Sequence, residues 1–335
     1  MLRLPWFDFR APATVGEAAK ILAGEGPRAM LVAGGTDLIP NMKRRHQSPQ
    51  VLVSLRGVEA LRKVNGALGA GVTLSELVGD RSLKERHRAL WQAASLVATP
   101  HLRNMATLGG NLCLDTRCTY YNQSHEWRQA IDYCLKKDGE TCWVATASKR
   151  CVAVSSTDTA PALIALDAKV KLVSSQGERE VALADLYRND GIDYLTRRAD
   201  EILTQVSIPA GWTSSYWKLR RRGSFDFPVL GVAAAAKLAP DGTVEEARIA
   251  LGAAASRPFL VEKAGEFLKG RRLTDEVIGE AAAMTASRAK PMDNTDLDLY
   301  WRKDVAAAFA GYALREVRGD DMAEIRRRVA RQPLL

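Results

Sequence analysis

One stretch of the sequence, from Thr107 to Leu166, constrains the fold more than any other, because it contains all five cysteines of the 335-residue chain. Cys113 comes first, and the other four follow with 15, 7 and 8 residues between them: Cys118, Cys134, Cys142 and Cys151. The N-terminal residues include Asp8 and Arg10 where a signal peptide would be apolar. We therefore expect a cytoplasmic protein whose thiols act together in a site and do not form a disulfide framework.

Four thiolates in one polar loop are typical of two kinds of site. A 4Fe-4S cluster takes one external sulfur ligand at each iron, and a structural zinc ion takes four thiolates in a tetrahedron. Zinc sites usually contain C-x2-C pairs, and the chain has none. Ligand chemistry alone nevertheless leaves both alternatives open.

Two glycine pairs predict a site for nucleotide phosphates. AGGTDL, at 33–38, follows the apolar residues 29–32, and TLGGNL, at 107–112, precedes the cysteines. Glycine lets backbone N–H groups approach an anion closely, and a threonine hydroxyl adds a donor. Either pair alone is more often an ordinary turn, whereas two pairs are able to close on one extended dinucleotide. Neither pair is a GxGxxG motif, so a nicotinamide-binding fold is not indicated.

Composition places the chain among ordinary globular proteins, since 47% of its residues are hydrophobic and 26% are charged. It has no apolar run long enough to span a membrane. The net charge of +9 comes partly from arginine clusters that are scattered along the chain. Because no aromatic or zinc-finger pattern accompanies them, we expect no nucleic-acid binding and favour an acidic protein partner or a phosphate-rich ligand.

Apolar periodicity predicts an α+β protein. Helix-capping sequences occur at Thr14–Glu17 and Thr73–Glu76. In the first two thirds of the chain, strands are expected at 29–32, 51–55, 162–168, 170–173 and 201–208, and helices at 38–45, 74–78 and 86–97. The last third is expected to contain three strands, at 216–219, 229–238 and 244–251, and then helices at 259–268, 275–288 and 300–317.

Four ordered motifs resemble those of the FAD-binding medium subunit of the xanthine oxidase family of molybdenum hydroxylases: AGGTDL, TLGGNL, TDTAPALIALDA at 157–168, and YWKLRRRGSFDFPVLGVAAAA at 216–236. The resemblance implies a two-subdomain FAD-binding fold, of the vanillyl-alcohol-oxidase type, followed by a C-terminal three-stranded antiparallel sheet with a helical bundle. The FAD-binding residues that it implies are Val32, Ala33, Gly34, Gly35, Thr36, Asp37, Leu38, Thr107, Gly109, Gly110, Asn111, Asp158 and Lys218.

The cysteine-rich insertion is the main departure from that family. Its sequence, DTRCTYYNQSHEWR followed by YCLK, GETC and SKRC, is similar to the β subunit of 4-hydroxybenzoyl-CoA reductases. This resemblance implies a 4Fe-4S cluster held by Cys118, Cys134, Cys142 and Cys151. Cys113 is then a spare thiol, expected to be a half-buried small hydrophobe, and His125 a loop residue. Four aromatic residues are expected to shield the cluster: Tyr120, Tyr121, Trp127 and Tyr133.

No general acid–base pair or nucleophile triad stands out, which fits a subunit that transfers electrons. The resemblance implies a large partner subunit with the molybdopterin cofactor and a small one with 2Fe-2S clusters. It also implies an acidic ferredoxin as electron donor, with electrons passing through the 4Fe-4S cluster and FAD to the partners. There, 4-hydroxybenzoyl-CoA would lose its phenolic hydroxyl. A hydroxylating dehydrogenase of another substrate, and a zinc-stabilised flavin-binding protein, remain as alternatives.

The same resemblance divides the chain into three parts. Residues 1–58 would form the first FAD-binding subdomain, and residues 59–210 the second, with the iron–sulfur insertion at 113–156. Residues 214–330 would form the C-terminal domain, since Gly211 and its neighbours suggest a boundary.

Overall fold

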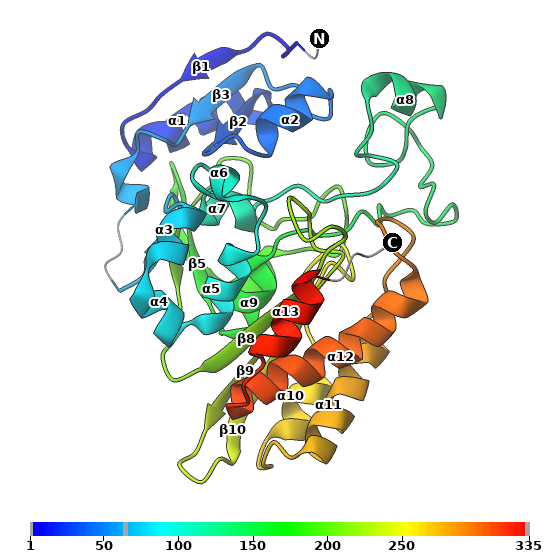
Figure 1. Cartoon of the computed structure of the whole chain (residues 1–335). Helices are drawn as coiled ribbons and strands as arrows, with labels where there is room; N and C mark the ends of the chain where they lie inside the picture. The colour runs from blue at the N-terminus through cyan, green and yellow to red at the C-terminus, as the bar shows by residue number, and fades with distance from the viewer. Residues whose placement is uncertain (1–2, 63–65, 332–335) are drawn as a thin grey trace.

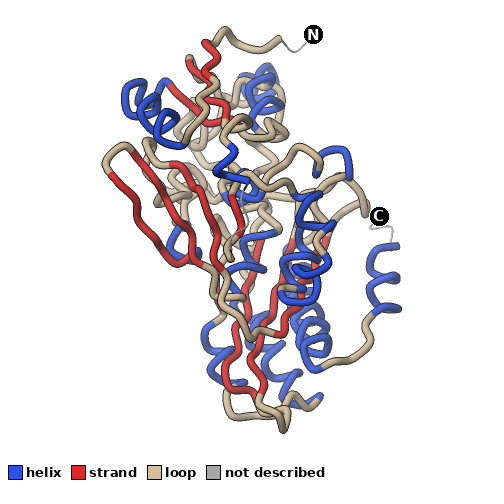
Figure 2. Tube along the Cα trace, turned by 90° about the vertical axis from the view of Figure 1, so that its left-hand side faces the viewer, coloured by secondary structure: helices blue, strands red, loops and turns tan. Residues whose placement is uncertain are grey.

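A computed structural model describes residues 3–62 and 66–331. Residues 1–2 and 63–65, which fall within the first two expected domains, lie outside this description. Three sheets organise the described residues (Figure 1). In Figure 2 the short N-terminal sheet lies near the marked N-terminus, and longer strands occupy the middle and lower parts of the molecule.

The N-terminal sheet is parallel and ends at the first glycine motif. Its strand order is β1 (Asp8–Arg10), β3 (Val51–Ser54) and β2 (Ala29–Val32). Helix α1 (Val15–Glu25) buries one apolar stripe against β3, and Thr14 caps it by accepting a hydrogen bond from the Glu17 amide. The glycine loop follows β2 directly and leads into α2 (Leu38–Lys43).

A second sheet, antiparallel, carries the middle of the chain. Its order is β4 (Leu68–Gly69), β7 (Ile202–Ser207), β5 (Lys169–Ser174) and β6 (Gly177–Ala182). Six helices accompany it in the described residues: α3 (Leu74–Gly79), α4 (Arg81–Arg86), α5 (Arg88–Ser95), α6 (Pro100–Arg103), α7 (Leu108–Leu112) and α9 (Thr159–Ala165). The cysteine-rich insertion lies between α7 and α9 in the sequence. It contains α8 (His125–Ala130), which lies at the edge of the molecule in Figure 1. Buried Arg128 of α8 donates to the Arg44 carbonyl at 3.0 Å.

The C-terminal sheet is antiparallel, in the order β11 (Phe259–Leu260), β10 (Val244–Gly252), β9 (Leu230–Leu238) and β8 (Thr213–Leu219). Four helices follow in the described residues: α10 (Glu262–Leu268), α11 (Asp275–Arg288), α12 (Leu299–Arg318) and α13 (Ala323–Arg331). Buried Glu316 of α12 ties these parts together, because its carboxylate pairs with Arg88 of α5 at 2.8 Å and with Arg326 of α13. Among the described residues, no helix combines the length and the apolar composition that crossing a membrane would require.

The expected three long C-terminal strands and the full capping box at Thr73–Glu76 are present. Two sequence-based predictions were wrong. Residues 159–165 form a helix where a strand was predicted at 162–168. All seven residues of this helix are buried, so its sequence lacks the alternation of apolar and polar residues that marks a helix with one exposed face. Residues 259–260 form a short fourth strand, and the helix predicted to start there begins at Glu262.

Candidate cofactor sites

The two glycine motifs line one cavity of about 590 Å³. Its size is in the range of cavities that hold cofactors. Twelve of the thirteen residues predicted to bind FAD are in its wall: Val32, Ala33, Gly34, Gly35, Thr36, Asp37, Leu38, Thr107, Gly109, Gly110, Asn111 and Asp158. The structure therefore brings together segments that lie more than 100 residues apart in the sequence. We call this space the flavin cavity.

Contacts within the protein, and not only a bound ligand, require glycine in both motifs. A Cβ atom on Gly34 would lie 1.8 Å from the carbonyl oxygen of Met105, in the segment just before the second motif. A Cβ atom on Gly109 would lie 2.8 Å from the Cβ of Ala70, and Gly35 has a φ of +70°. The first glycine loop and the segment preceding the second are therefore in direct backbone contact. The glycine motifs alone predict only the approach of an anion, and this packing constraint is visible only in the structure.

Asp37 lines the flavin cavity, and its carboxylate is held by two neighbours. One oxygen pairs with the Arg117 guanidinium, and the other accepts a hydrogen bond from the side-chain amide of Asn41 at 3.0 Å. Burial lowers the pKa of Arg117 to about 10, so the guanidinium stays charged near neutral pH. Because Arg117 directly precedes Cys118, this ion pair connects the first glycine loop to the cysteine-rich insertion.

Lys218, the thirteenth predicted residue, is not among the residues that line the flavin cavity. Its ammonium group donates to Asp158 Oδ2 at 2.9 Å and to the carbonyl oxygens of Leu96 and Asp226 at 2.9 and 2.8 Å. These bonds use all three of its donors. Lys218 therefore acts on the cavity indirectly, by holding Asp158 and Asp226, which line it. Burial raises the pKa of Asp158 and lowers that of Lys218, and their ion pair opposes both shifts. Tyr216 donates to the second Asp158 oxygen at 2.8 Å.

Asn111 joins the two ends of the insertion. Its side-chain oxygen accepts hydrogen bonds from the Thr157 hydroxyl at 2.8 Å, from the Thr159 hydroxyl at 2.6 Å and from the Thr159 amide at 3.2 Å. All of these groups are buried. A second closure lies further out, where Arg117 and Val154 exchange backbone hydrogen bonds of 2.8 and 2.7 Å. The insertion is therefore a closed loop attached at a fixed base.

A second, much smaller cavity lies inside the insertion, and four cysteines line it: Cys118, Cys134, Cys142 and Cys151. Each of them is at most 9% exposed, and all five cysteines of the chain are free thiols. Burial raises the pKa of Cys118 and raises that of Cys151 to about 11. Within residues 3–62 and 66–331, no three His, Cys, Asp or Glu side chains are grouped to hold a single metal ion. We call this space the cysteine cavity.

Hydrophobic shielding of the cysteine cavity differs partly from expectation. Tyr120 and Tyr121 line it as predicted, but Trp127 and Tyr133 do not. Trp127 lies on α8 with 41% of its surface exposed. Their places are taken by other residues of the same loop, which the sequence analysis missed: Leu135, Trp143 and Val144.

Two residues set aside in the sequence analysis also have defined positions. Cys113 is partly buried and packs against the main core, as expected for a small hydrophobe, but it lines the flavin cavity. His125 begins α8, is partly buried, and is not among the residues that line the cysteine cavity. Neither residue joins the four cysteines around their cavity.

Gly191, for which the sequence predicts no role, packs against the cysteine cavity. A Cβ atom at this position would lie 2.6 Å from Cys151 Sγ and 2.8 Å from the Ala153 amide nitrogen. Its own amide donates to the Cys151 carbonyl at 2.9 Å. The close approach of this backbone to the Cys151 sulfur therefore requires a residue without a side chain at position 191. A glycine in a polar loop is too common for sequence alone to reveal this role.

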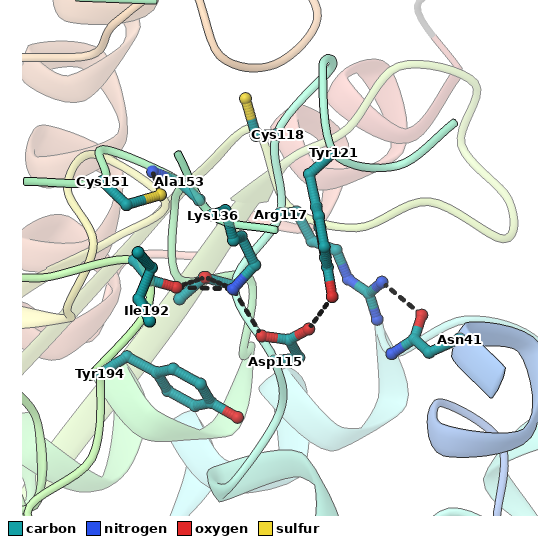
Figure 3. Close-up of polar contacts among 12 residues, drawn as sticks. Asn41, Asp115, Arg117, Cys118, Tyr121, Lys136, Cys151, Ala153, Ile192 and Tyr194 are labelled. Atoms are coloured by element: carbon teal, nitrogen blue, oxygen red, sulfur yellow. Dashed lines mark hydrogen bonds and ion pairs between the residues drawn. The ribbon is translucent and has the colours of Figure 1, made fainter. Parts of the chain in front are cut away.

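The walls of the two cavities are joined by a buried polar network (Figure 3). Asp115 lines the flavin cavity, and both Lys136 and Tyr121 line the cysteine cavity. One Asp115 oxygen pairs with the Lys136 ammonium at 2.8 Å, and the other accepts a hydrogen bond from the Tyr121 hydroxyl at 3.0 Å. Neither Asp115 nor Lys136 was a candidate in the sequence analysis. The signal available in the sequence was the motif DTRC, in which two charged residues, Asp115 and Arg117, come just before Cys118.

Comparison with known proteins agrees with this arrangement. Residues 5–211 match a family described as the FAD binding domain in molybdopterin dehydrogenase, and residues 214–317 match the CO dehydrogenase flavoprotein C-terminal domain. The chain is 31% identical over 298 residues to the aldehyde oxidoreductase FAD-binding subunit PaoB of Escherichia coli (strain K12), covering 84% of this chain and 92% of that protein. It is 26% identical over 322 residues to the carbon monoxide dehydrogenase medium chain of Hydrogenophaga pseudoflava, covering 93% and 95%.

The fold is also that of a solved structure. A chain in the structure of carbon monoxide dehydrogenase from Hydrogenophaga pseudoflava, which lacks the Mo-pyranopterin moiety, superposes with a TM-score of 0.75 at 25% identity. The superposition covers 93% of this chain and 97% of that one.

Replacing Asn111 with alanine is expected to lower the free energy of unfolding by about 1–3 kcal/mol, because buried hydroxyl and amide donors would lose their acceptor. Chemical denaturation of the wild type and the variant measures this difference. Asn189→Ala is the matched control, since Asn189 is exposed. Equal losses in the two variants would contradict a role for Asn111 in closing the insertion.

Replacing Gly191 with alanine is expected to destabilise the protein by about 1–3 kcal/mol, since the added methyl group overlaps Cys151 and Ala153. Thermal unfolding followed by circular dichroism measures the change. In the control, Gly279→Ala, the methyl group meets no atom within 4 Å on helix α11. This control should be neutral or slightly stabilising. An unchanged melting temperature in Gly191→Ala would show that the close approach is easily relieved.

Proposed function

Because the chain belongs to the family of FAD-binding domains of molybdopterin dehydrogenases, we propose that it is the FAD-carrying medium subunit of a heteromeric molybdenum oxidoreductase. The observation that carries this proposal is the flavin cavity, whose wall contains both glycine motifs. FAD would supply a redox centre able to accept and release electrons. The backbone of residues 33–36 and of residues 107–111 would hold it, and Asp158 would be positioned by Lys218 and Tyr216.

The partners proposed are a large subunit with the molybdenum cofactor and a small subunit with 2Fe-2S clusters. This assignment extends to this chain the role implied by the names of its relatives, which are called an FAD-binding subunit and a medium chain. The transformation of substrate would take place on the large partner. Within this chain we propose FAD-binding subdomains at 1–58 and 59–210, followed by a C-terminal domain at 214–330.

We further propose that Cys118, Cys134, Cys142 and Cys151 hold a 4Fe-4S cluster. All four are buried and face one cavity, which is the arrangement that thiolate ligation of such a cluster requires. Aromatic and aliphatic side chains around the cavity would limit access of water, one of the factors that set the potential of an iron–sulfur centre. Within the protein, Gly191 would position Cys151 as a ligand.

The finer proposal is a 4-hydroxybenzoyl-CoA reductase type of enzyme with an acidic ferredoxin as its electron donor. Support comes from the insertion, which adds a candidate redox site beside the flavin cavity, and from the net charge of +9, which suits an acidic partner. A hydroxylating dehydrogenase with another substrate is the second candidate. The relatives named above favour that class, since they are an aldehyde oxidoreductase and a carbon monoxide dehydrogenase.

Protein purified without oxygen is expected to contain one FAD, and about four iron and four acid-labile sulfide per chain, as one cubane requires. Iron, zinc and sulfide analysis of the wild type and of Cys134→Ser measures this. The variant should lose iron and sulfide and keep FAD, because Cys134 does not line the flavin cavity. Cys113→Ser, which removes the thiol outside the cysteine cavity, should retain iron and sulfide. Zinc without sulfide in the wild type would refute the cluster and support a structural zinc site.

The complex purified with its partners is expected to accept electrons from a reduced ferredoxin and to convert 4-hydroxybenzoyl-CoA. The Cys134→Ser complex should lose ferredoxin-dependent reduction of its FAD, which is followed by flavin absorbance. Normal reduction in this variant would rule out the cluster as the electron input. A complete, molybdenum-loaded complex that is inactive with 4-hydroxybenzoyl-CoA would exclude the reductase and leave the hydroxylating dehydrogenase.

A further inference from the structure

Lys136 is a buried cation at the boundary between the two cavities. Its side chain is 6% exposed and that of its partner Asp115 is 5% exposed. Besides Asp115, the ammonium donates to the Thr116 hydroxyl at 2.8 Å and to the Gly191 carbonyl at 2.6 Å. All three donors are therefore used. The three acceptors come from the start of the insertion and from residue 191, so Lys136 fastens the middle of the insertion to its surroundings.

The contacts of Lys136 reach toward both cavities. It lines the cysteine cavity, and Gly191, to which it donates, abuts the Cys151 sulfur. On the other side, Asp115 and Tyr194 line the flavin cavity, and the Lys136 ammonium lies 5.6 Å from the Tyr194 ring centroid. In the view of Figure 3, Lys136 lies between Asp115 below it and the labelled cysteines above and to its side.

Two ion pairs lie between the cavities. Besides Lys136–Asp115, the Arg117 guanidinium pairs with Asp37, but the Asp37 side chain is 27% exposed, whereas Lys136 and Asp115 are at most 6% exposed. His46 stacks on Tyr121 with ring centroids 4.2 Å apart, but burial and the charge of Arg128 lower its pKa to about 4. His46 is therefore neutral near pH 7. The Tyr121 phenol is also neutral, since its hydroxyl donates a hydrogen bond to Asp115 at 3.0 Å.

We propose that the buried Lys136–Asp115 pair sets the reduction potentials of both redox centres. This inference rests on the proposed function, since it concerns the groups that the two cavities would hold. A centre that gains an electron gains negative charge, which is stabilised by Lys136 and opposed by Asp115. In a buried, weakly screened location such charges act over longer distances than at the surface. Lys136 and Asp115 are thus positioning and potential-setting residues.

The proposal predicts shifts of opposite sign for the two partners. Lys136→Met leaves the Asp115 carboxylate without its ammonium partner and should move the midpoint potentials of the flavin and of the iron–sulfur centre to more negative values. Asp115→Asn leaves the ammonium unpaired and should move both to more positive values. The double variant should return toward the wild type, and Lys136→Arg, which keeps the charge, should shift less than Lys136→Met. A merely structural role would not produce this reversal of sign.

The measurement is a spectroelectrochemical titration of the complex purified with its partners, with the flavin followed by absorbance and the cluster by electron paramagnetic resonance. Lys137→Met is the matched control, because Lys137 is the next residue in the same loop, is 38% exposed and pairs with Asp138. It should leave both potentials unchanged. If Lys136→Met does not yield folded protein, the positive shift in Asp115→Asn and its cancellation in the double variant decide the question.

Failure of this inference is distinguishable from failure of the proposed function. Wild-type complex that contains FAD and no iron or sulfide would refute the cluster, and the flavin potentials would still test the ion pair. Wild-type complex with both centres, combined with unchanged potentials or with shifts of the same sign in Lys136→Met and Asp115→Asn, would overturn the inference alone. Wild-type complex that lacks both centres would overturn both.

Discussion

The hydrogen bonds that converge on the Asn111 side chain are the constraint on which the rest of the arrangement depends. They join α7 to the start of α9 across the insertion, so the two halves of the flavin cavity wall stay together although the chain leaves between them. The Arg117–Val154 backbone pairing then closes the neck of the insertion. Because both closures lie at its base, the insertion leaves the wall of the flavin cavity continuous, while its outer part, including α8, lies at the edge of the molecule (Figure 1) and contacts Arg44 and His46 after α2.

Burial of charge around the flavin cavity follows a common pattern. Each of the four carboxylates in its wall has a cationic partner: Asp37 pairs with Arg117, Asp115 with Lys136, Asp158 with Lys218, and Asp226 with Arg222. Unpaired carboxylates would be costly to bury and would repel the phosphates of a dinucleotide. When each carboxylate is paired with a cation, it orients neighbouring groups and repels an anionic ligand only weakly. Buried ion pairs are weak evidence for stability, so their value here lies in positioning and in local charge.

How much could be predicted from the sequence depended on whether a feature was local. The glycine motifs, the four cysteines and the C-terminal strands have strong local patterns, and the structure brings the motif residues together. The helix over 159–165 was missed because it is buried on every side. The constraints at Gly34 and Gly191 were missed because each arises from contact with a segment distant in sequence. Lys218 illustrates the same limit, since only the structure reveals that its donors are all used within the protein.

The proximity of the two cavities follows from the connectivity of the chain. Asp115 lines the flavin cavity and Cys118 lines the cysteine cavity, three residues later. Three residues of extended chain span at most about 11 Å, so these wall residues must remain near each other however the outer loop moves. Arg117, between them, is anchored to Asp37 and Val154, and Lys136 returns from the far part of the insertion to Asp115. The two cavities thereby share a wall within one chain, so a substitution in that wall changes the lining of both.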